Sequence, residues 1–469
     1  MLHLPPASTR PRRLRALASV GVLVAVASVL AACGATATPG PATPSASIGA
    51  VTSPSASATP SAPPAVTPAA TPMEQGPPTV GPSPTPGASA SIGPTPTPLD
   101  PMALFRTIGE QTARVRQLDW KEPIEPRLID EAELRRMMEK DLDAETPAEV
   151  IARTEALYRG LGMMTGDRSL RDLYLDAMGA QVLGFYRDTD RTLYVVKRSG
   201  DIGPIEEFTV SHELTHALQD QNFGLGNLRL DEPDQGDRAL ATRALVEGDA
   251  TLASFQWMQG NLTFKDLSDI VKAGLDPAPQ AALDALPPIA RIALTFPYEN
   301  GLAWVMGLQQ KGGWEAVDAA WKDPPASTEQ ILHPGKYAAG EKPVEVALPA
   351  GLAKRMGAGW RLTMEDTFGE LGLRTWLAQV GAPAAADAAA AGWGGDRVGL
   401  YEGPGGAWAI VIRTAWDDEA AAQRFAPAAA VVAASLPHAT VGFDADGPVV
   451  LVGSDASIVK KLRSLVIGG

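Results

Sequence analysis

Hydrophobic residues follow two different periods along this chain, one typical of strands and one typical of helices. Short apolar runs at 181–186 and 192–196 flank the polar, turn-like segment 187–191, which predicts a β-hairpin. Before the hairpin, apolar residues recur at helical spacing beside charged faces. The segments with this helical pattern are 131–142, 147–160 and 167–178.

Two further helices are expected directly after the hairpin. The first begins near Pro204, has two acidic residues in its first turn, and is ended by Asn222 and Gly224. The second covers residues 240–258 and is apolar on nearly all its faces. A helix of that kind is expected to be buried.

The carboxyl-terminal part of the chain has another pattern, in which short apolar runs alternate with helical segments. A Gly-Pro-Gly-Gly turn separates the first two runs, and an alanine-rich helix at 417–435 follows them. A last helix is expected at 456–466. The order is ββαββα, with strands expected at 398–401, 407–413, 440–443 and 449–452.

The pattern as a whole predicts an α+β protein with two folded parts. A helix-rich domain is expected at 100–343, and the small ββαββα domain at 344–469. The net charge of −14 argues against nucleic acid as a partner. It argues equally against binding to an anionic membrane surface.

The amino terminus predicts export from a bacterial cell. Four arginines precede an apolar stretch, so residues 1–32 are expected to be a signal peptide. Cys33 is the only cysteine, and the small residues before it resemble a bacterial lipobox, in which that cysteine receives lipid. The alternatives are an ordinary secretory signal and an uncleaved membrane helix. Residues 33–99 are mostly Pro, Ser, Thr, Ala and Gly, which predicts a disordered tether between the membrane and the folded part of the chain.

The candidate chemistry lies in the segment 212–216, which reads His-Glu-Leu-Thr-His. In a helix, residues four apart share one face, so the imidazoles of His212 and His216 can reach one ion. Glu213 lies beside them, where a carboxylate can take a proton from water at the metal. The chain has only 5 histidines, so a chance match is rare. The alternative is a solvated helix with two surface histidines.

A catalytic zinc ion takes three protein ligands, so a third donor must come from further along the chain. Glu247 lies in the helix expected to be buried, where a dication would keep its carboxylate ionised. A salt bridge to Arg243, one turn earlier, is the alternative partner for Glu247. Asp249 is a competing ligand, although its expected role is to orient a histidine. The other downstream carboxylates occupy a turn-rich loop and are Asp231, Glu232, Asp234 and Asp237.

The HExxH segment followed by residues 244–250 resembles the gluzincin branch of zinc metalloproteases, to which thermolysin belongs. Segments 296–301 and 327–334 are similar to predicted bacterial exported metallopeptidases of this type. The resemblance implies a zincin-like domain with one Zn²⁺ per chain, peptide hydrolysis, and a cleft edged by a strand. The chain departs from the thermolysin pattern at Thr251, where that pattern has an aspartate that supports a histidine.

These observations predict a zinc peptidase tethered to the cell surface through lipid on Cys33, with a peptide or protein as its substrate. Glu213 is expected to act as general base and then as general acid. A further donor should stabilise the oxyanion, and Tyr298 and His333 are candidates because both lie in turn-flanked segments. The alternative places Tyr298 in the core and His333 at the end of a short helix that Ser327 begins.

Two other functions remain open at this point. The chain could be a non-catalytic binding or assembly lipoprotein on a zincin fold. It could also be a zinc hydrolase that cleaves a non-peptide bond, such as a cell-wall amide. Imidazole and carboxylate ligands also suit cobalt or iron, so the ligand types alone do not fix the metal.

Overall fold

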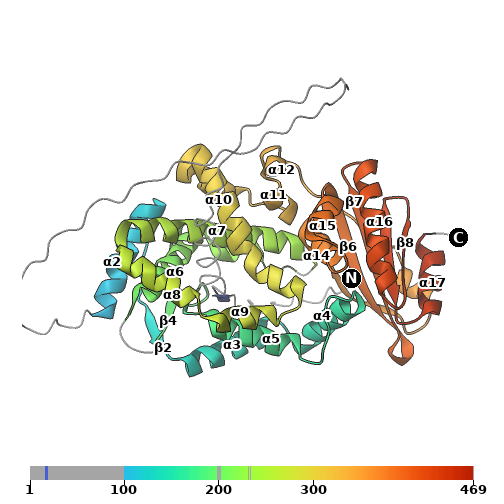
Figure 1. The fold of residues 1–469 in the computed structure, drawn as a ribbon, viewed down its shortest axis with the longest axis horizontal. Helices are drawn as coiled ribbons and strands as arrows, with labels where there is room; N and C mark the ends of the chain where they lie inside the picture. Colours follow the sequence, from blue (N-terminus) through green and yellow to red (C-terminus); the bar gives the residue numbers. More distant parts are fainter. Residues whose placement is uncertain (1–15, 19–99, 198–201, 231, 233, 468–469) are drawn as a thin grey trace, which may run out of the picture. The chain divides into compact units, whose positions relative to one another are not determined.

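A computed structural model of the chain describes residues 16–18, 100–197, 202–230, 232 and 234–467 (Figure 1). All the described residues belong to one compact unit. The predicted tether and Cys33 lie outside the described residues, as does the signal peptide apart from residues 16–18. Within the described ranges, no helix has both the length and the apolar character needed to cross a membrane.

The part that precedes residue 343 is mostly helical and contains one small sheet. The sheet has the strand order β1-β3-β4-β2, in which β3 pairs antiparallel with β4 and β2 pairs parallel with β4. The predicted hairpin is confirmed, since Phe185 faces Tyr194 across the β3–β4 ladder. The strands are β1 (Ala16–Ala18), β2 (Arg127–Ile129), β3 (Gly184–Arg187) and β4 (Thr192–Val196).

The helices around this sheet include those that the sequence predicts, together with others. They are α2 (Pro101–Arg116), α3 (Glu131–Glu145), α4 (Ala148–Gly160), α5 (Leu170–Gln181), α6 (Pro204–Phe223), η1 (Leu225–Leu228), α7 (Gly236–Asn261), α8 (Phe264–Gly274), α9 (Pro277–Asp284), α10 (Pro288–Lys322), α11 (Thr328–Leu332) and α12 (Pro334–Ala338).

The carboxyl-terminal part contains a five-stranded antiparallel sheet in the order β5-β6-β7-β9-β8, which confirms the α+β class. The predicted ββαββα order is present, and strand β5 with helices α13, α14 and α15 precedes it. The elements are α13 (Leu352–Met356), β5 (Arg361–Asp366), α14 (Gly369–Leu377), α15 (Pro383–Ala390), β6 (Trp393–Glu402), η2 (Pro404–Gly406), β7 (Trp408–Trp416), α16 (Glu419–Ser435), β8 (Ala439–Phe443), β9 (Pro448–Gly453) and α17 (Ala456–Val466).

Alternation along the strands explains why helices cover both faces of this sheet. On β7, Ile410 and Ile412 pack into one core with side chains of α14, α15 and α16. Ala409 and Val411 point to the other face and pack with α13 and α17. Because successive strand residues face opposite sides, each apolar run in these strands contributes to two hydrophobic cores.

Helices α7 and α10 touch backbone to backbone at a pair of glycines. A Cβ atom built on Gly248 would lie 2.3 Å from the carbonyl carbon and oxygen of Gly301. A Cβ atom on Gly301 would lie 2.2 Å from the carbonyl oxygen of Ala244. Side chains cannot fit at either position, so the contact fixes α10 directly against the part of α7 that carries Glu247.

Two carboxylates hold the first turn of α7, one from the carboxyl-terminal sheet and one through α11. Asp366 of β5 accepts a hydrogen bond from the Gly236 amide at 2.8 Å. Asp237 accepts from the amide and the hydroxyl of Thr328, where α11 begins. An acidic group at a helix amino terminus satisfies an amide that has no partner within the helix. The beginning of α7 is therefore held from two sides.

We predict that Gly301→Ala separates α7 from α10, because the added methyl group would overlap the carbonyl of Ala244. The free energy of unfolding, measured by urea denaturation, should fall by about 2–3 kcal/mol or more. Gly307→Ala on the same helix is the control, since its Cβ meets no atom within 4 Å. That variant should gain up to about 1 kcal/mol from its higher helix propensity. Equal denaturation midpoints for the two variants would contradict the close contact.

Candidate metal centre

Two helices carry the candidate metal site, and their sequence explains how each begins or ends. Pro204 occupies the first turn of α6, and the Gly203 amide donates to the Glu206 carboxylate at 3.1 Å. Gly224 ends this helix with a positive φ of 76°, a conformation that favours glycine. Helix α7 packs against α6 and is buried over most of its length, as its apolar faces predict.

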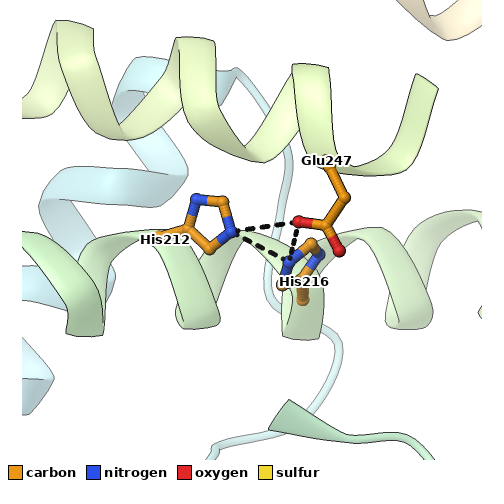
Figure 2. Close-up of side chains that lie close together, drawn as sticks. All are labelled: His212, His216 and Glu247. Carbon is orange, nitrogen blue, oxygen red and sulfur yellow. Dashed lines mark hydrogen bonds and ion pairs between the residues drawn. The ribbon is translucent and has the colours of Figure 1, made fainter. Parts of the chain in front are cut away.

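The structure brings together the three predicted ligands, as Figure 2 shows. The Nε2 atoms of His212 and His216 lie 3.1 Å apart, and each is 3.3 Å from Oε2 of Glu247. The histidines are 1% and 0% exposed, and Glu247 is 4% exposed. The alternative of a solvated helix with surface histidines is therefore wrong. The alternative salt bridge is not formed either, since the partners of Glu247 are these histidines and not Arg243.

The electrostatics of the cluster show that it favours a positive charge. Burial lowers the pKa of His212. Burial also acts to lower the pKa of His216, but the adjacent Glu247 carboxylate outweighs this effect and raises it. For Glu247 itself, burial is outweighed by the two imidazoles, which hold its pKa well below the usual range. A proton or a cation among the three donors satisfies all of these interactions.

Gln219 fixes the orientation of His216, and this role was not predicted from the sequence. Its Oε1 lies 2.8 Å from Nδ1 of His216, and its Nε2 donates to the Val246 carbonyl at 3.0 Å. Because the amide nitrogen is used by Val246, the oxygen must accept from Nδ1–H of His216. The lone pair on Nε2 then faces the cluster. The spacing in the sequence could have predicted this contact, because Gln219 is three residues after His216 and so lies on the same helix face.

The hairpin positions Glu213. Its Oε2 accepts a hydrogen bond from the backbone amide of Tyr186 in β3 at 2.9 Å, and the residue is fully buried. A Cβ atom on Gly184 of the same strand would lie 3.6 Å from Cγ of Glu213, so the strand passes close to this side chain. The strand thus holds the carboxylate next to the two histidines of α6.

Tyr298 lies beside the cluster but not in a turn-flanked segment, so that expectation is wrong. It occupies the interior of α10, directly after Pro297, and is 3% exposed. Its ring centroid is 6.2 Å from that of His212, with an angle of 29° between the planes. The pairing of α10 with α7 is what brings Tyr298 to the site.

The structure does not bring His333 to the cluster. His333 follows the short helix α11, which Ser327 caps by accepting from the Gln330 amide, as the alternative expectation has it. Its Nε2 lies 2.8 Å from Oε1 of Glu370 in α14, and its side chain is 43% exposed. His333 therefore connects α11 to the carboxyl-terminal part of the chain.

Asp249 contacts neither histidine and instead binds a buried arginine. Its two carboxylate oxygens accept from Arg116 at 2.5 and 3.0 Å, and Trp321 donates to one of them at 2.8 Å. The Arg116 guanidinium also binds Asp318 and lies 4.4 Å from the ring centroid of Trp314. The expected role of Asp249 as a support for a histidine is not met, because it joins α7 to α2 and α10.

A cavity of about 370 Å³ adjoins the cluster, with Glu247 and Tyr298 in its wall. Most of its lining is apolar and comes from α3, α5, β3 and α10. Its apolar lining residues include Leu134, Met138, Met178, Phe185 and Leu294. The arrangement can admit an apolar side chain next to the donors.

A second group of carboxylates that could in principle hold an ion comprises Glu329, Glu341 and Asp417. The ammonium of Lys336 lies 2.6, 2.6 and 2.5 Å from these three carboxylates. A lysine therefore already supplies the positive charge at this position.

Comparison with known proteins concerns the carboxyl-terminal sheet. A family described as "Domain of unknown function (DUF8575)" matches residues 359–459. Among curated proteins and solved structures, no match was found. The family match begins just before β5 and ends within α17, so helices α6 and α7 lie outside it.

We predict that Asp249→Ala is strongly destabilising, because it leaves the fully buried Arg116 without its main partner. The expected loss in the free energy of unfolding is about 3–5 kcal/mol, measured by urea denaturation. Asp318→Ala is the control, because the Asp318 side chain is 31% exposed and its loss should cost much less. An Asp249→Ala variant as stable as the wild type, but with weaker metal binding, would favour the histidine-supporting role instead.

Proposed function

We propose that this chain is a zinc-dependent peptidase with a zincin-like catalytic domain. His212, His216 and Glu247 would hold one Zn²⁺, and Glu213 would carry protons. The observation that supports this most directly is the convergence of three buried donor atoms from two helices within 3.3 Å of one another. With the predicted signal peptide and Cys33, we place the enzyme outside the cytoplasmic membrane of a bacterial cell, anchored by lipid.

The donor set fits a zinc ion in number, type and spacing. Ligand atoms about 2.0–2.2 Å from an ion at tetrahedral angles lie roughly 3.3–3.6 Å apart, close to the spacings of the three donors. Two imidazoles and one carboxylate leave a fourth position for water, as catalytic zinc sites require. Nδ1–H of His216 donates a hydrogen bond to Gln219, which leaves Nε2 of His216 with the lone pair that a metal needs.

When bound, zinc polarises a carbonyl group and makes a coordinated water more acidic. The part of the reaction carried by this chain is proton transfer. The carboxylate of Glu213 would accept a proton from the water as the water oxygen bonds to the carbonyl carbon of the peptide. It would then return that proton to the amine nitrogen as the carbon–nitrogen bond breaks. The Tyr186 amide holds that carboxylate in position throughout.

Tyr298 is the residue we propose as the donor to the developing oxyanion. Its ring lies beside His212, and it borders the same cavity as Glu247. His333 is not part of the proposal, because Glu370 binds it away from the cluster.

Metal content and hydrolysis measured on the same purified samples test the proposal. The wild type should hold about one zinc per chain and cleave an unfolded protein substrate. Glu247→Ala should lose both, because one ligand is missing. Glu213→Gln should keep the metal but lose about 10²–10⁴ in rate, because the base is missing. A wild type without metal would contradict the site, and metal without cleavage would favour the binding or non-peptide alternatives.

The role of Gln219 gives a separate prediction. Gln219→Ala should weaken zinc affinity by about 10–100-fold, measured by competition with a chelator, because His216 loses the partner that orients it. Gln221→Ala is the control on the same helix, since that side chain binds the backbone of Lys121 and Glu122 rather than the cluster. Equal affinities for the two variants would show that the glutamine does not support the site.

A further inference from the structure

The cavity beside Glu247 is lined by an arginine that forms no ion pair with the acidic side chains of the described residues. Arg243 lies on α7 four residues before Glu247, is exposed, and lines the same cavity. Among the described residues it forms no hydrogen bond or salt bridge, although Glu247 would be within reach along the helix. An arginine without a counter-ion at the wall of a largely apolar cavity can bind an anionic group of a ligand.

The other charged groups that line the cavity are already engaged. Asp141 binds Arg187 at 2.6 Å, and Arg171 binds both oxygens of Asp143 at 2.8 and 3.0 Å. Glu145 also has an interaction partner. Within the described part of the chain, a ligand that enters the cavity can therefore bind Arg243 without breaking an existing ion pair.

Tyr174 adds a neutral donor to the same wall. Burial raises the pKa of its phenol to about 12, although the nearby Arg243 opposes the shift. The hydroxyl therefore keeps its proton at neutral pH and can donate to an anion. A guanidinium and a phenol together offer the donors that a carboxylate accepts.

We infer that this cavity binds a carboxylate of the substrate through Arg243 and Tyr174, so that the peptidase selects peptides with a negative charge close to the scissile bond. The inference rests on the proposed function and names its substrate class. The carboxylate can belong to an acidic side chain or to a free carboxyl terminus, because both present the same group.

Helix geometry sets the position of that charge. Four residues of helix separate Arg243 from Glu247, a rise of about 6 Å. Consecutive residues of an extended peptide are about 3.3–3.6 Å apart, so the carboxylate belongs to a residue about two positions from the bond that is cleaved. The apolar lining from α3 and α5 then surrounds the side chain or chain end that carries it.

Matched peptides test the inference. Ala/Leu peptides that carry Glu or Gln at successive positions measure the side-chain preference, and peptides with a free or an amidated carboxyl terminus measure the terminal preference. The wild type should cleave one charged series with kcat/KM on the order of 10- to 100-fold above its neutral partner. Arg243→Gln should abolish that ratio, and Arg243→Glu should invert it in favour of Lys peptides.

Arg171→Gln is the control, because it removes an equal charge from the same cavity but one that Asp143 already neutralises. Its ratio should stay within about threefold of the wild-type ratio. If the wild type shows no charge preference, or if the preference survives Arg243→Gln, the inference is overturned.

Binding to the Glu213→Gln variant separates this inference from the proposed function. Fluorescence anisotropy with the same labelled peptides reports affinity without turnover. The Glu213→Gln variant should bind the charged peptides more tightly than the neutral ones, and the double variant that also carries Arg243→Gln should lose this difference. That result supports the carboxylate site even if no peptide is hydrolysed. Equal affinities for charged and neutral peptides overturn it, even if the wild type proves to be an active peptidase.

Discussion

The structure depends on one constraint, which is that the carboxylate of Glu247 is buried in a helix packed on nearly all sides. A buried charge is tolerated only with a partner, and here the partners are two imidazoles on a neighbouring helix. Helices α6 and α7 must therefore lie in one relative position. The glycine contact between α7 and α10 serves this arrangement, because it sets α10 close enough for Tyr298 to reach His212.

Other polar contacts hold α7 in place near and away from Glu247. Gln219 joins His216 to the carbonyl of Val246, one residue before the carboxylate. Asp249, two residues after it, binds Arg116 of α2 and Trp321 of α10. Asp366 of the carboxyl-terminal sheet caps the first turn. Sites built on helices restrained in this way keep their geometry more precisely than sites on loops, which would suit the proposed metal centre.

Local pattern was enough to predict the hairpin, the helix of the HExxH segment, and the grouping of His212, His216 and Glu247. It failed where the structure depends on distant partners. Pro297 suggests a helix boundary, yet α10 runs through it because the packing against α7 outweighs the local preference. Strand β5 was not predicted, since its residues are only partly buried at a sheet edge and carry little periodic signal. The Arg116–Asp249 pair spans 133 residues, so no local pattern could reveal it.

The choice of partner for Glu247 also determines what its neighbour can do. By sequence, one helical turn offers Glu247 a salt bridge to Arg243, which would neutralise both charges and leave the histidines without a third donor. In the structure Glu247 binds the histidines instead, and the guanidinium of Arg243, at the wall of the same cavity, has no acidic partner among the described residues. A single helix thus presents an anion toward the two histidines and a cation toward the cavity. In the proposed peptidase, this separation by one turn would couple the site of proton transfer at Glu213 to the binding of a substrate carboxylate at Arg243.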